Sequence, residues 1–404
     1  MIHRVLIVLH RWTGLFMALF LVVVGLTGSL LAFNTELERF FAPQLFAAPR
    51  PGAVRLDLAT LADRAQAIVY DGRVQSVTYT ESDQARVDFI PRINPTTGQP
   101  FDLGFDDFFL DPWTGKELGR RRNGDLSEGR INVMPFIYSL HWRLAAGNLG
   151  QWILGIVAFV WSLDCFVGFF LTLPRGLGRF WRRWSYAWWV KWKATPFRVN
   201  FDLHRAGGLW MWGALFIFAW SSVMMNIRPL YEHVMAAVFA YDSPREDFMI
   251  SAKPTDSPRL DWHAAQSVGE RLMADESRIH SFTVGQPLGL AYYPETGAYF
   301  YDARTSRDVF QRSPKGGTTS VMFDGDTGEL RFLWLPTGGR TGNTVESWLY
   351  ALHMTRVFGR PYQIFVCILG AVVALLSVTG VYIWWRKRQG RLLAGRVTLR
   401  KAGA

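Results

Sequence analysis

The sequence predicts a membrane protein: an all-α four-helix transmembrane bundle with two α+β modules on the outer side of the membrane. Three observations predict this class. Four long apolar segments occur along the chain, basic residues are concentrated in two short segments beside them, and the two halves of the chain repeat each other. Half of the 404 residues are hydrophobic, and this content is concentrated in the four segments.

The four apolar segments are long enough to cross the hydrocarbon core, which takes about 20 helical residues. None carries Lys or Arg in its central part, and only Asp164 interrupts the apolar pattern. The first is too long for the core of a signal peptide and no small-residue cleavage motif follows it, so we expect it to stay attached. The spans run approximately over Leu15–Phe33, Trp152–Leu173, Leu209–Met225 (extended toward His204) and Tyr362–Trp385.

These spans divide the chain into eight segments. We expect the first span in residues 1–33, a first outer module in 34–140, the second span in 141–173, an interfacial segment in 174–203, the third span in 204–227, a second outer module in 228–352, the fourth span in 353–385 and a basic tail in 386–404.

Charge predicts the orientation of the spans. The interfacial segment holds seven Lys and Arg against one acid, and the tail holds seven and no acid, whereas both outer modules carry more acids than bases. Because Lys and Arg accumulate on the cytoplasmic side, both termini are predicted to be cytoplasmic and both modules external. The net charge of +11 therefore reflects membrane orientation, and nucleic-acid binding is not expected.

The interfacial segment also contains five tryptophans among its basic residues: Trp181, Trp184, Trp188, Trp189 and Trp192. This composition predicts an amphipathic helix that lies in the headgroup plane and contacts lipid, with a docking surface for a cytoplasmic partner as the alternative. The only cysteines, Cys165 and Cys367, lie in apolar segments without CxxC, CxxCH or zinc-type spacing. Disulfides, covalently attached haem and structural zinc are therefore not expected.

An internal repeat relates the two halves of the chain. A shift of 194 residues places His10-Arg11 on His204-Arg205, and a shift of 212 places Leu140-His141 on Leu352-His353. The second shift also matches Gly147 with Gly359 and Gly168 with Gly380, and a shift of 213 matches the turns that begin at Asp111 and Asp324. In each half, a helix that runs outward is followed by a module and then by a helix that runs inward. Because both halves have the same orientation, the repeat is parallel.

Periodicity predicts α+β structure in both modules. Apolar residues at helical spacing predict helices over Leu58–Val69 and Trp262–Met273. Alternating or aromatic character predicts strands over Val74–Thr80, Ala85–Ile90, Phe108–Leu110, Leu290–Tyr293, Tyr299–Asp302 and Ser320–Phe323.

Four of the eight histidines occupy matching ends of the spans. His10 and His204 lie at the cytoplasmic ends, and His141 and His353 at the outer ends. An ionisable side chain near hydrocarbon is costly, which favours a functional role. Neutral imidazoles presented in pairs by facing helices are suited to axial ligation of haem iron. The alternative is a capping or headgroup-contacting residue, but the pairing by depth and by repeat favours ligation.

Residues near these histidines suit a porphyrin. Arginines beside each histidine are candidates to pair with propionates: Arg11, Arg205, Arg143 and Arg356. Small residues are needed where a flat macrocycle enters between helices, and the candidates are Gly14, Gly25, Gly28, Gly147, Gly155, Gly207, Gly208, Gly213, Gly359 and Gly370. The other histidines, His3, His233, His263 and His280, are expected to be ordinary surface or core residues.

With these residues the chain resembles the PepSY-associated transmembrane family of bacterial inner-membrane proteins. The resemblance spans nearly the whole chain and rests on short motifs: Leu9-His10-Arg11-Trp12 with Gly25-Leu26-Thr27-Gly28, Asp202-Leu203-His204-Arg205, Leu140-His141, Leu352-His353, Val378-Thr379-Gly380 with Trp384-Trp385-Arg386, and the Asp…Thr-Gly turns at 111–115 and 324–328.

The resemblance implies two b-type haems and reduction of ferric siderophores on the periplasmic side of the inner membrane. Carried over by position, His10 and His204 would hold one haem and His141 and His353 the other. Nothing in the chain resembles a flavin or nicotinamide domain, so the electron donor, a flavoprotein or a quinol, is not identified. Two other classes stay open: a haem-free PepSY binding or regulatory protein, and a siderophore or iron transporter.

Overall fold

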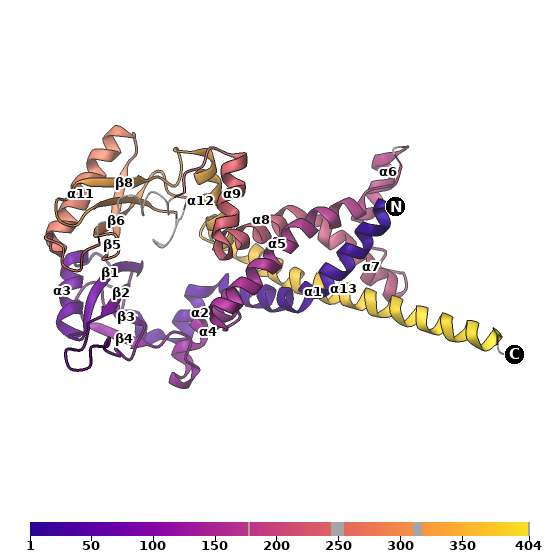
Figure 1. Cartoon of the computed structure of the whole chain (residues 1–404), viewed down its shortest axis with the longest axis horizontal. Helices are drawn as coiled ribbons and strands as arrows, with labels where there is room; N and C mark the ends of the chain where they lie inside the picture. Colours follow the sequence, from indigo (N-terminus) through magenta and orange to yellow (C-terminus); the bar gives the residue numbers. More distant parts are fainter. Residues whose placement is uncertain (177, 244–253, 310–316, 403–404) are drawn as a thin grey trace. The chain divides into compact units, whose positions relative to one another are not determined.

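The computed structural model describes residues 1–176, 178–243, 254–309 and 317–402. The chain forms two compact units, each assembled from separate stretches of sequence. The helical unit contains residues 1–33, 137–231 and 360 onward, and the sheet unit contains residues 34–136 and 232–359. Figure 1 colours the chain by position and labels the elements of both.

Long helices build the helical unit. Three are long and apolar enough to cross a membrane: α1 (Ile2–Leu31), α5 (Gly147–Thr172) and α13 (Gly359–Ala402), the last over Gly359–Leu392. A fourth crossing is available if α7 (Pro196–Trp210) and α8 (Trp212–Asn226) act together. Shorter helices at its edges are α4 (Val133–Arg143), α6 (Phe180–Ser185), η4 (Tyr186–Trp188) and α9 (Arg228–Val238).

The third predicted span is bent, which the sequence prediction of one helix over Leu209–Met225 did not include. Helices α7 and α8 meet at an angle of 68°. Met211 lies at the break, with φ −100° and ψ 4°. Gly207, Gly208 and Gly213 flank it, and glycine lowers helix stability by about 1 kcal/mol relative to alanine. The break separates the polar segment around His204 from the apolar helix α8.

The interfacial segment does not form the single amphipathic helix that its composition predicted. It consists of the six-residue helix α6, the turn η4 and an irregular stretch before α7. The cause is Arg205, whose guanidinium donates to the carbonyls of Tyr186, Ala187 and Trp189 and folds the segment back on α7. Trp181, Trp189 and Trp192 stay exposed along this folded segment.

Helices α1 and α13 approach closely at two glycines. A Cβ added to Gly25 would lie 2.6 Å from the Gly370 carbonyl oxygen, and one added to Gly370 would lie 2.3 Å from that of Gly25. The Ser29 hydroxyl donates to the Cys367 carbonyl across the same contact at 2.7 Å. Gly25 and Gly370 therefore serve helix packing and leave no slot for a macrocycle. Gly155 does the same against Ile227, the residue that follows α8.

The sheet unit contains one eight-stranded antiparallel sheet in the order β4-β3-β2-β1-β5-β6-β7-β8. The two predicted modules each supply four strands, joined where Val77 of β1 pairs with Leu290 of β5. The strands are β1 (Gly72–Glu81), β2 (Gln84–Pro91), β3 (Asp107–Leu110), β4 (Glu117–Arg121), β5 (Val284–Tyr293), β6 (Ala298–Thr305), β7 (Thr319–Asp324) and β8 (Leu330–Trp334).

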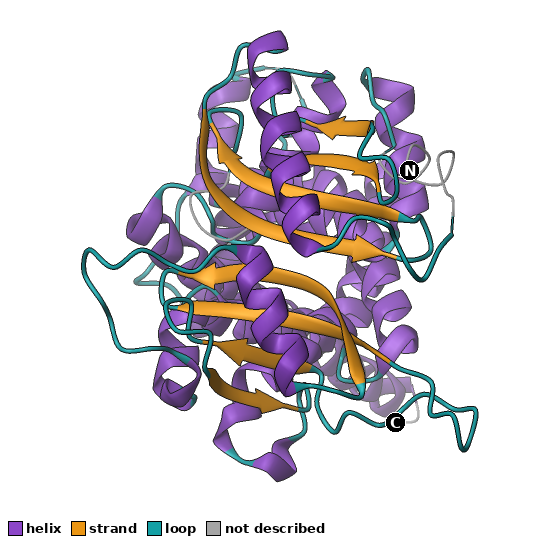
Figure 2. Cartoon of the chain, turned by 90° about the vertical axis from the view of Figure 1, so that its left-hand side faces the viewer, coloured by secondary structure: helices purple, strands orange, loops and turns teal. Residues whose placement is uncertain are grey.

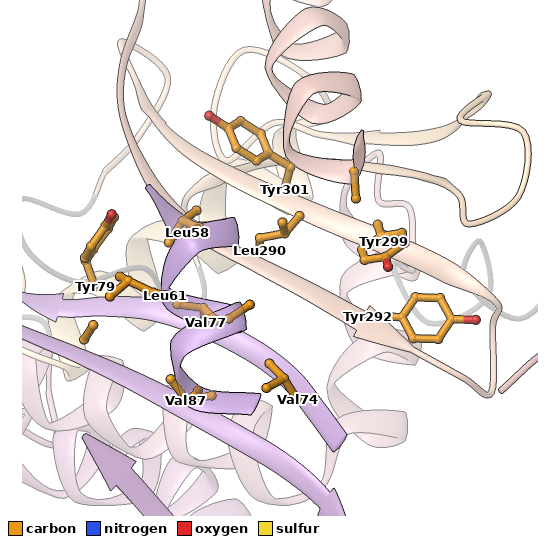
Figure 3. Close-up of a cluster of buried hydrophobic side chains, with 14 of the residues drawn as sticks. Leu58, Leu61, Val74, Val77, Tyr79, Val87, Leu290, Tyr292, Tyr299 and Tyr301 are labelled. Carbon is orange, nitrogen blue, oxygen red and sulfur yellow. The ribbon is translucent and has the colours of Figure 1, made fainter. Parts of the chain in front are cut away.

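Two helices cover the same face of this sheet, α3 (Leu58–Ile68) and α11 (Trp262–Ile279) (Figure 2). Each begins at an aspartate, Asp57 or Asp261, whose carboxylate accepts a backbone N–H of the first turn. Leu58 and Leu61 of α3 pack on inward residues of the central strands such as Val77 (Figure 3). The remaining short helices of the unit are α2 (Asn34–Phe41), η1 (Pro43–Leu45), η2 (Leu126–Glu128), η3 (Arg130–Asn132) and α12 (Thr341–His353).

Candidate functional site

Two predicted ligands, His10 and His204, lie close together in the helical unit with their rings tilted. Their ring centroids are 6.1 Å apart, with an angle of 58° between the ring planes. Metal–nitrogen bonds are about 2.0 Å long, so two imidazoles that share one metal atom have centroids about 6 Å apart. The separation therefore suits one iron atom between the rings.

Local structure places each histidine. His10 lies in the third turn of α1. His204 lies in α7, which begins at Pro196 after the N-cap Thr195, whose hydroxyl accepts from the Arg198 N–H at 3.4 Å. Proline at the first helical position has no N–H to lose and a backbone angle already suited to the helix. This start sets the turn on which His204 faces α1.

A carboxylate orients the ring of His10. Nδ1 lies 3.0 and 2.9 Å from the two carboxylate oxygens of Asp164, on α5, and the Thr13 hydroxyl donates to the same group at 3.0 Å. The Asp164 side chain is only 10% exposed, whereas that of His10 is 33% exposed. Because a carboxylate accepts, the proton of the His10 ring resides on Nδ1 and the lone pair on Nε2.

A backbone carbonyl orients the ring of His204 in the same manner. Its Nδ1 lies 3.0 Å from the Leu376 carbonyl oxygen and 3.0 Å from the Thr379 hydroxyl, both on α13. The Thr379 hydroxyl itself donates to the Leu376 carbonyl. A carbonyl only accepts, so His204 also carries its proton on Nδ1. In the described part of the chain neither Nε2 has a hydrogen-bond partner, so both lone pairs remain for a metal.

Glycines form the walls beside these rings. A Cβ at Gly168 would lie 3.5 Å from Cε1 of His10, and one at Gly380 would lie 3.1 Å from Cε1 of His204. Gly14 and Gly208 lie one helical turn beyond the two histidines, and a Cβ there would meet no atom within 4 Å. The open sides beside both rings suit the edge of a porphyrin. The residues present therefore fit a haem.

A metal without a porphyrin fits this site less well. Among the residues that the structure describes, no group of three or more His, Cys, Asp or Glu side chains converges in a way that would hold a metal ion. Haem iron takes four of its ligands from the porphyrin and needs only two from the protein.

The predicted propionate partners near this pair differ in what they contact. Arg205 forms an ion pair with Asp202 at 2.8 Å and donates to the carbonyls of the interfacial segment, so its guanidinium is already engaged. Arg11 has no ion-pair partner in the described residues. Lys387 of α13 lies close enough for the charge of Arg11 to act on it. Arg11 and Lys387 thus form a cationic patch near His10, and neither has an ion-pair partner among the described residues.

The outer histidines fall in different units. His141 lies in the helical unit, where its Nδ1 is 3.0 Å from the Thr27 hydroxyl and its Cε1 would lie 3.0 Å from a Cβ on Gly28. Near it, the Arg143 guanidinium donates to Ser139 and stacks over Trp142. His353, the last residue of α12, and Arg356 belong to the sheet unit. The pairing of His141 with His353 stays a prediction.

Two of the remaining histidines make exposed ion pairs in the sheet unit. His263 of α11 contacts Asp63 of α3 at 2.8 Å, and the Asp63 carboxylate raises the pKa of this exposed imidazole. His280 lies 3.3 Å from Glu276 within one helical turn. Both fit the expectation of ordinary surface residues.

The sequence did not identify the residues that orient the ligands. These residues lie 3 to more than 150 positions away from the histidines in the sequence. They are Thr13 and Asp164 for His10, Thr27 for His141 and Thr379 for His204. One signal was available for Asp164, since it is the only acid in the apolar spans, but its partner was not predictable. Thr27 and Thr379 lie in the short motifs Gly25-Leu26-Thr27-Gly28 and Val378-Thr379-Gly380, but these motifs did not show which histidine each threonine contacts.

The fold and the site define a polytopic membrane protein in which apolar helices present paired imidazoles and a separate antiparallel sheet unit is attached. The chain belongs to the PepSY-associated TM region family, whose model matches residues 7–387. The resemblance noted in the sequence is thus confirmed. No curated protein matches the chain.

Proposed function

We propose that this protein binds b-type haem through His10 and His204 and transfers electrons across a bacterial inner membrane to ferric siderophores in the periplasm. The observation that carries the proposal is the facing imidazole pair, with centroids 6.1 Å apart and both Nδ1 atoms engaged. Bound haem would supply reversible one-electron chemistry at its iron.

The residues around the pair have separate tasks in this proposal. His10 and His204 ligate through Nε2, and their Nδ1 partners keep each ring in the tautomer and orientation that ligation needs. The Arg11–Lys387 patch binds the propionates. Buried apolar residues of the helical unit, such as Met17, Leu215 and Leu369, keep water from the electron path.

We further propose that the two halves of the chain arose by duplication and that His141 and His353 hold a second haem near the outer face. In this proposal four spans cross the membrane, both termini lie in the cytoplasm and the sheet unit lies in the periplasm. The Thr27 hydroxyl and the adjacent Gly28 give His141 surroundings like those of the first pair, which supports this assignment.

The substrate class follows from the family resemblance. A siderophore binds Fe(III) far more tightly than Fe(II), so addition of one electron to the chelated iron releases the metal. One electron is taken from a donor on the cytoplasmic side for each Fe(III) reduced, and no bond of the siderophore is cleaved.

The first experiment tests haem binding. The full chain, produced with ample haem and purified in detergent, is expected to show a Soret band and sharp α and β bands after dithionite. His10→Ala and His204→Ala are each expected to remove the same part of the low-spin spectrum. His263→Ala, on the exposed surface of the sheet unit, serves as the control and should leave the spectrum unchanged. A wild-type protein without a Soret band contradicts the proposal.

The second experiment tests the substrate. The protein is reduced anaerobically with dithionite, freed of excess reductant and mixed with a ferric siderophore beside an Fe(II)-specific chromogenic chelator. Reoxidation of the α band with stoichiometric appearance of Fe(II) supports the proposal. A reduced spectrum that persists over minutes with several siderophore classes contradicts the siderophore assignment and leaves haem binding intact.

A further inference from the structure

The interfacial segment has a packed side and an open side. On the packed side, the Trp184 indole N–H donates to the Thr172 hydroxyl at 3.2 Å, and the Trp184 ring lies edge-on to that of Phe169. The Trp188 carbonyl accepts from the indole N–H of Trp210 at 3.1 Å. The segment is thus a folded surface that the ends of α5 and α7 hold in place.

The open side carries large aromatic side chains that remain exposed. Trp181, Trp189 and Trp192 are 74%, 70% and 69% exposed, and Tyr186 is 60% exposed. Because other tryptophans of the same segment are packed, an unfolded segment does not account for this exposure. A cluster of exposed aromatic side chains indicates contact with a membrane or with another protein. Tryptophan favours the headgroup level of a bilayer, since its ring is apolar and its indole N–H is polar.

Basic side chains lie between these aromatic residues. Five of them are exposed and form no ion pair within the described part of the chain: Arg179, Arg182, Arg183, Lys191 and Lys193. The only acid of the segment is Asp202, which is fully buried and already bound by Arg198 and Arg205. The exposed surface of residues 179–193 therefore carries positive charge alone, which is complementary to an anionic partner.

A membrane-spanning helix fixes the place of this surface. Helix α5 is long and apolar enough to span, and it ends at Thr172, shortly before α6 begins at Phe180. The contact of Trp184 with Phe169 joins the segment to the last turn of α5. In Figure 1, α6 lies at the end of the helical unit where α1 begins. Headgroups are always present beside the end of a span, whereas a soluble partner would expose the tryptophans to water whenever it dissociated. The observations therefore favour lipid.

We propose that residues 179–193 form a binding surface for the headgroups of anionic phospholipids. The exposed tryptophans lie among the headgroups, and the arginine guanidiniums bind the lipid phosphates through paired hydrogen bonds. A zwitterionic lipid carries a cation that offsets its phosphate, so the surface favours lipids with a net negative charge. This inference concerns a surface apart from the histidine pair and does not depend on haem binding.

Lipid titration of the full chain, followed by native mass spectrometry, tests the charge preference. The purified chain in detergent is titrated with phosphatidylglycerol or with phosphatidylcholine of the same acyl chains. Phosphatidylglycerol is expected to bind about tenfold more tightly or better. The double variant Arg182→Gln/Arg183→Gln keeps polar side chains but removes two charges, and it should weaken phosphatidylglycerol binding about tenfold. The matched control is Arg120→Gln/Arg122→Gln in the sheet unit, which removes as many exposed charges and should leave the preference unchanged.

A second variant tests the aromatic part of the surface. Trp192→Ala removes an exposed ring and no charge, and no hydrogen bond of its indole is lost within the described residues. It should weaken both lipids by the same factor, so the preference for phosphatidylglycerol should persist. A change that affects phosphatidylglycerol alone would contradict the separate roles of ring and charge.

Three other outcomes would overturn the proposal. Equal binding of the two lipids by the wild-type chain would leave the exposed tryptophans to a protein partner. A full preference in the Arg182→Gln/Arg183→Gln chain would assign the lipid to another basic surface. Loss of the preference when inorganic phosphate replaces chloride at constant ionic strength would show a general anion site. Each of these results is independent of haem content, so the proposed function stands or fails separately.

Discussion

Matched positions of the two halves behave differently in the sheet unit and in the helical unit. In the sheet, Asp111 accepts from the N–H groups of Trp113 and Thr114, and Asp324 accepts from those of Asp326 and Thr327. In the helical unit His10 and His204 also receive their Nδ1 partners from matching positions, 164 and 376. The partner of His10 is the Asp164 carboxylate, whereas that of His204 is the Leu376 backbone carbonyl. The backbone geometry of the repeat is thus shared, and the two halves differ in charge.

The largest expected effect compares the two turns directly. Asp324 forms an ion pair with Arg331, and both side chains are about nine-tenths buried. Arg50 is 48% exposed and lies 3.5 Å from Asp111. Asp324→Ala leaves a buried, uncompensated guanidinium and should cost about 3–5 kcal/mol. Asp111→Ala loses an equivalent turn and should cost about 1–2 kcal/mol. Hydrogen exchange of the β7 and β3 amides in the full chain measures both.

Equal losses at the two positions would show that the turns, and not the ion pair, determine stability.

The pH dependence of stability is a further check on the Asp324–Arg331 ion pair. Burial acts to raise the pKa of Asp324, but Arg331 and the N–H groups of Thr327 and Asp326 outweigh it and hold the pKa well below its usual range. Because the folded pKa is depressed, this stabilisation is present above about pH 4 and is lost as the pH falls further.

The glycines beside the histidines provide a second, smaller comparison. A methyl group at Gly168 would make ordinary contact with His10, whereas one at Gly380 would be tight against His204. Gly380→Ala should therefore displace the ring and cost about 1–3 kcal/mol. Gly168→Ala should be neutral or stabilise its helix by up to about 1 kcal/mol. Thermal unfolding followed by circular dichroism measures the change in stability. The haem content of each purified variant reports whether the His204 ring is displaced. Equal losses at both positions would remove this difference between the halves.

The smallest expected effect involves Asp88 and Asp302, the fifth residues of β2 and β6. Serines donate to both, Ser76 to Asp88 and Ser320 to Asp302. Asp88 also pairs with Arg86 at 2.7 Å, but the corresponding position in β6 is Phe300. Burial, opposed by the Ser320 hydrogen bond, raises the pKa of Asp302 to about 6.

The sign of this pH dependence follows from the raised pKa. Between about pH 4 and pH 6 the folded protein binds more protons than the unfolded chain, so stability falls as the pH rises through that range. Asp302→Asn should remove the decrease and stabilise β6 by about 1 kcal/mol at pH 8, with little effect at pH 4. Hydrogen exchange of β6 at both pH values tests this. A variant that is equally stabilised at pH 4 would contradict the role of ionisation.

Local patterns predicted most of the sheet unit. Alternation located β1, β2, β3, β5, β6 and β7, and apolar spacing located α3 and α11. The two edge strands were missed for a physical reason. Residues Glu117–Arg121 carry three charged side chains, and Leu330–Trp334 lacks alternation, because an edge strand has one neighbour and little apolar surface to bury.

Long-range contacts limited the prediction of the site. The sequence indicated His10 and His204 through their repeat, and the structure brings their rings together. The sequence did not indicate that Gly25 and Gly370 pack helices against each other. Glycine occurs equally well where helices pack closely and where open space is needed. The bend at Met211 was also not predicted, because Gly207, Gly208 and Gly213 beside it were interpreted as room for a macrocycle.

The close contact of α1 with α13 has a consequence for biosynthesis. About 345 residues separate Gly25 from Gly370. At about 5–20 residues per second, the ribosome needs roughly 20–70 s to make that stretch. During this interval the glycine face of the first helix lacks its final neighbour, and His204 lacks the carbonyl of Leu376 that fixes its ring. The nascent chain thus contains both histidines early but completes their surroundings only when its last helix enters the membrane.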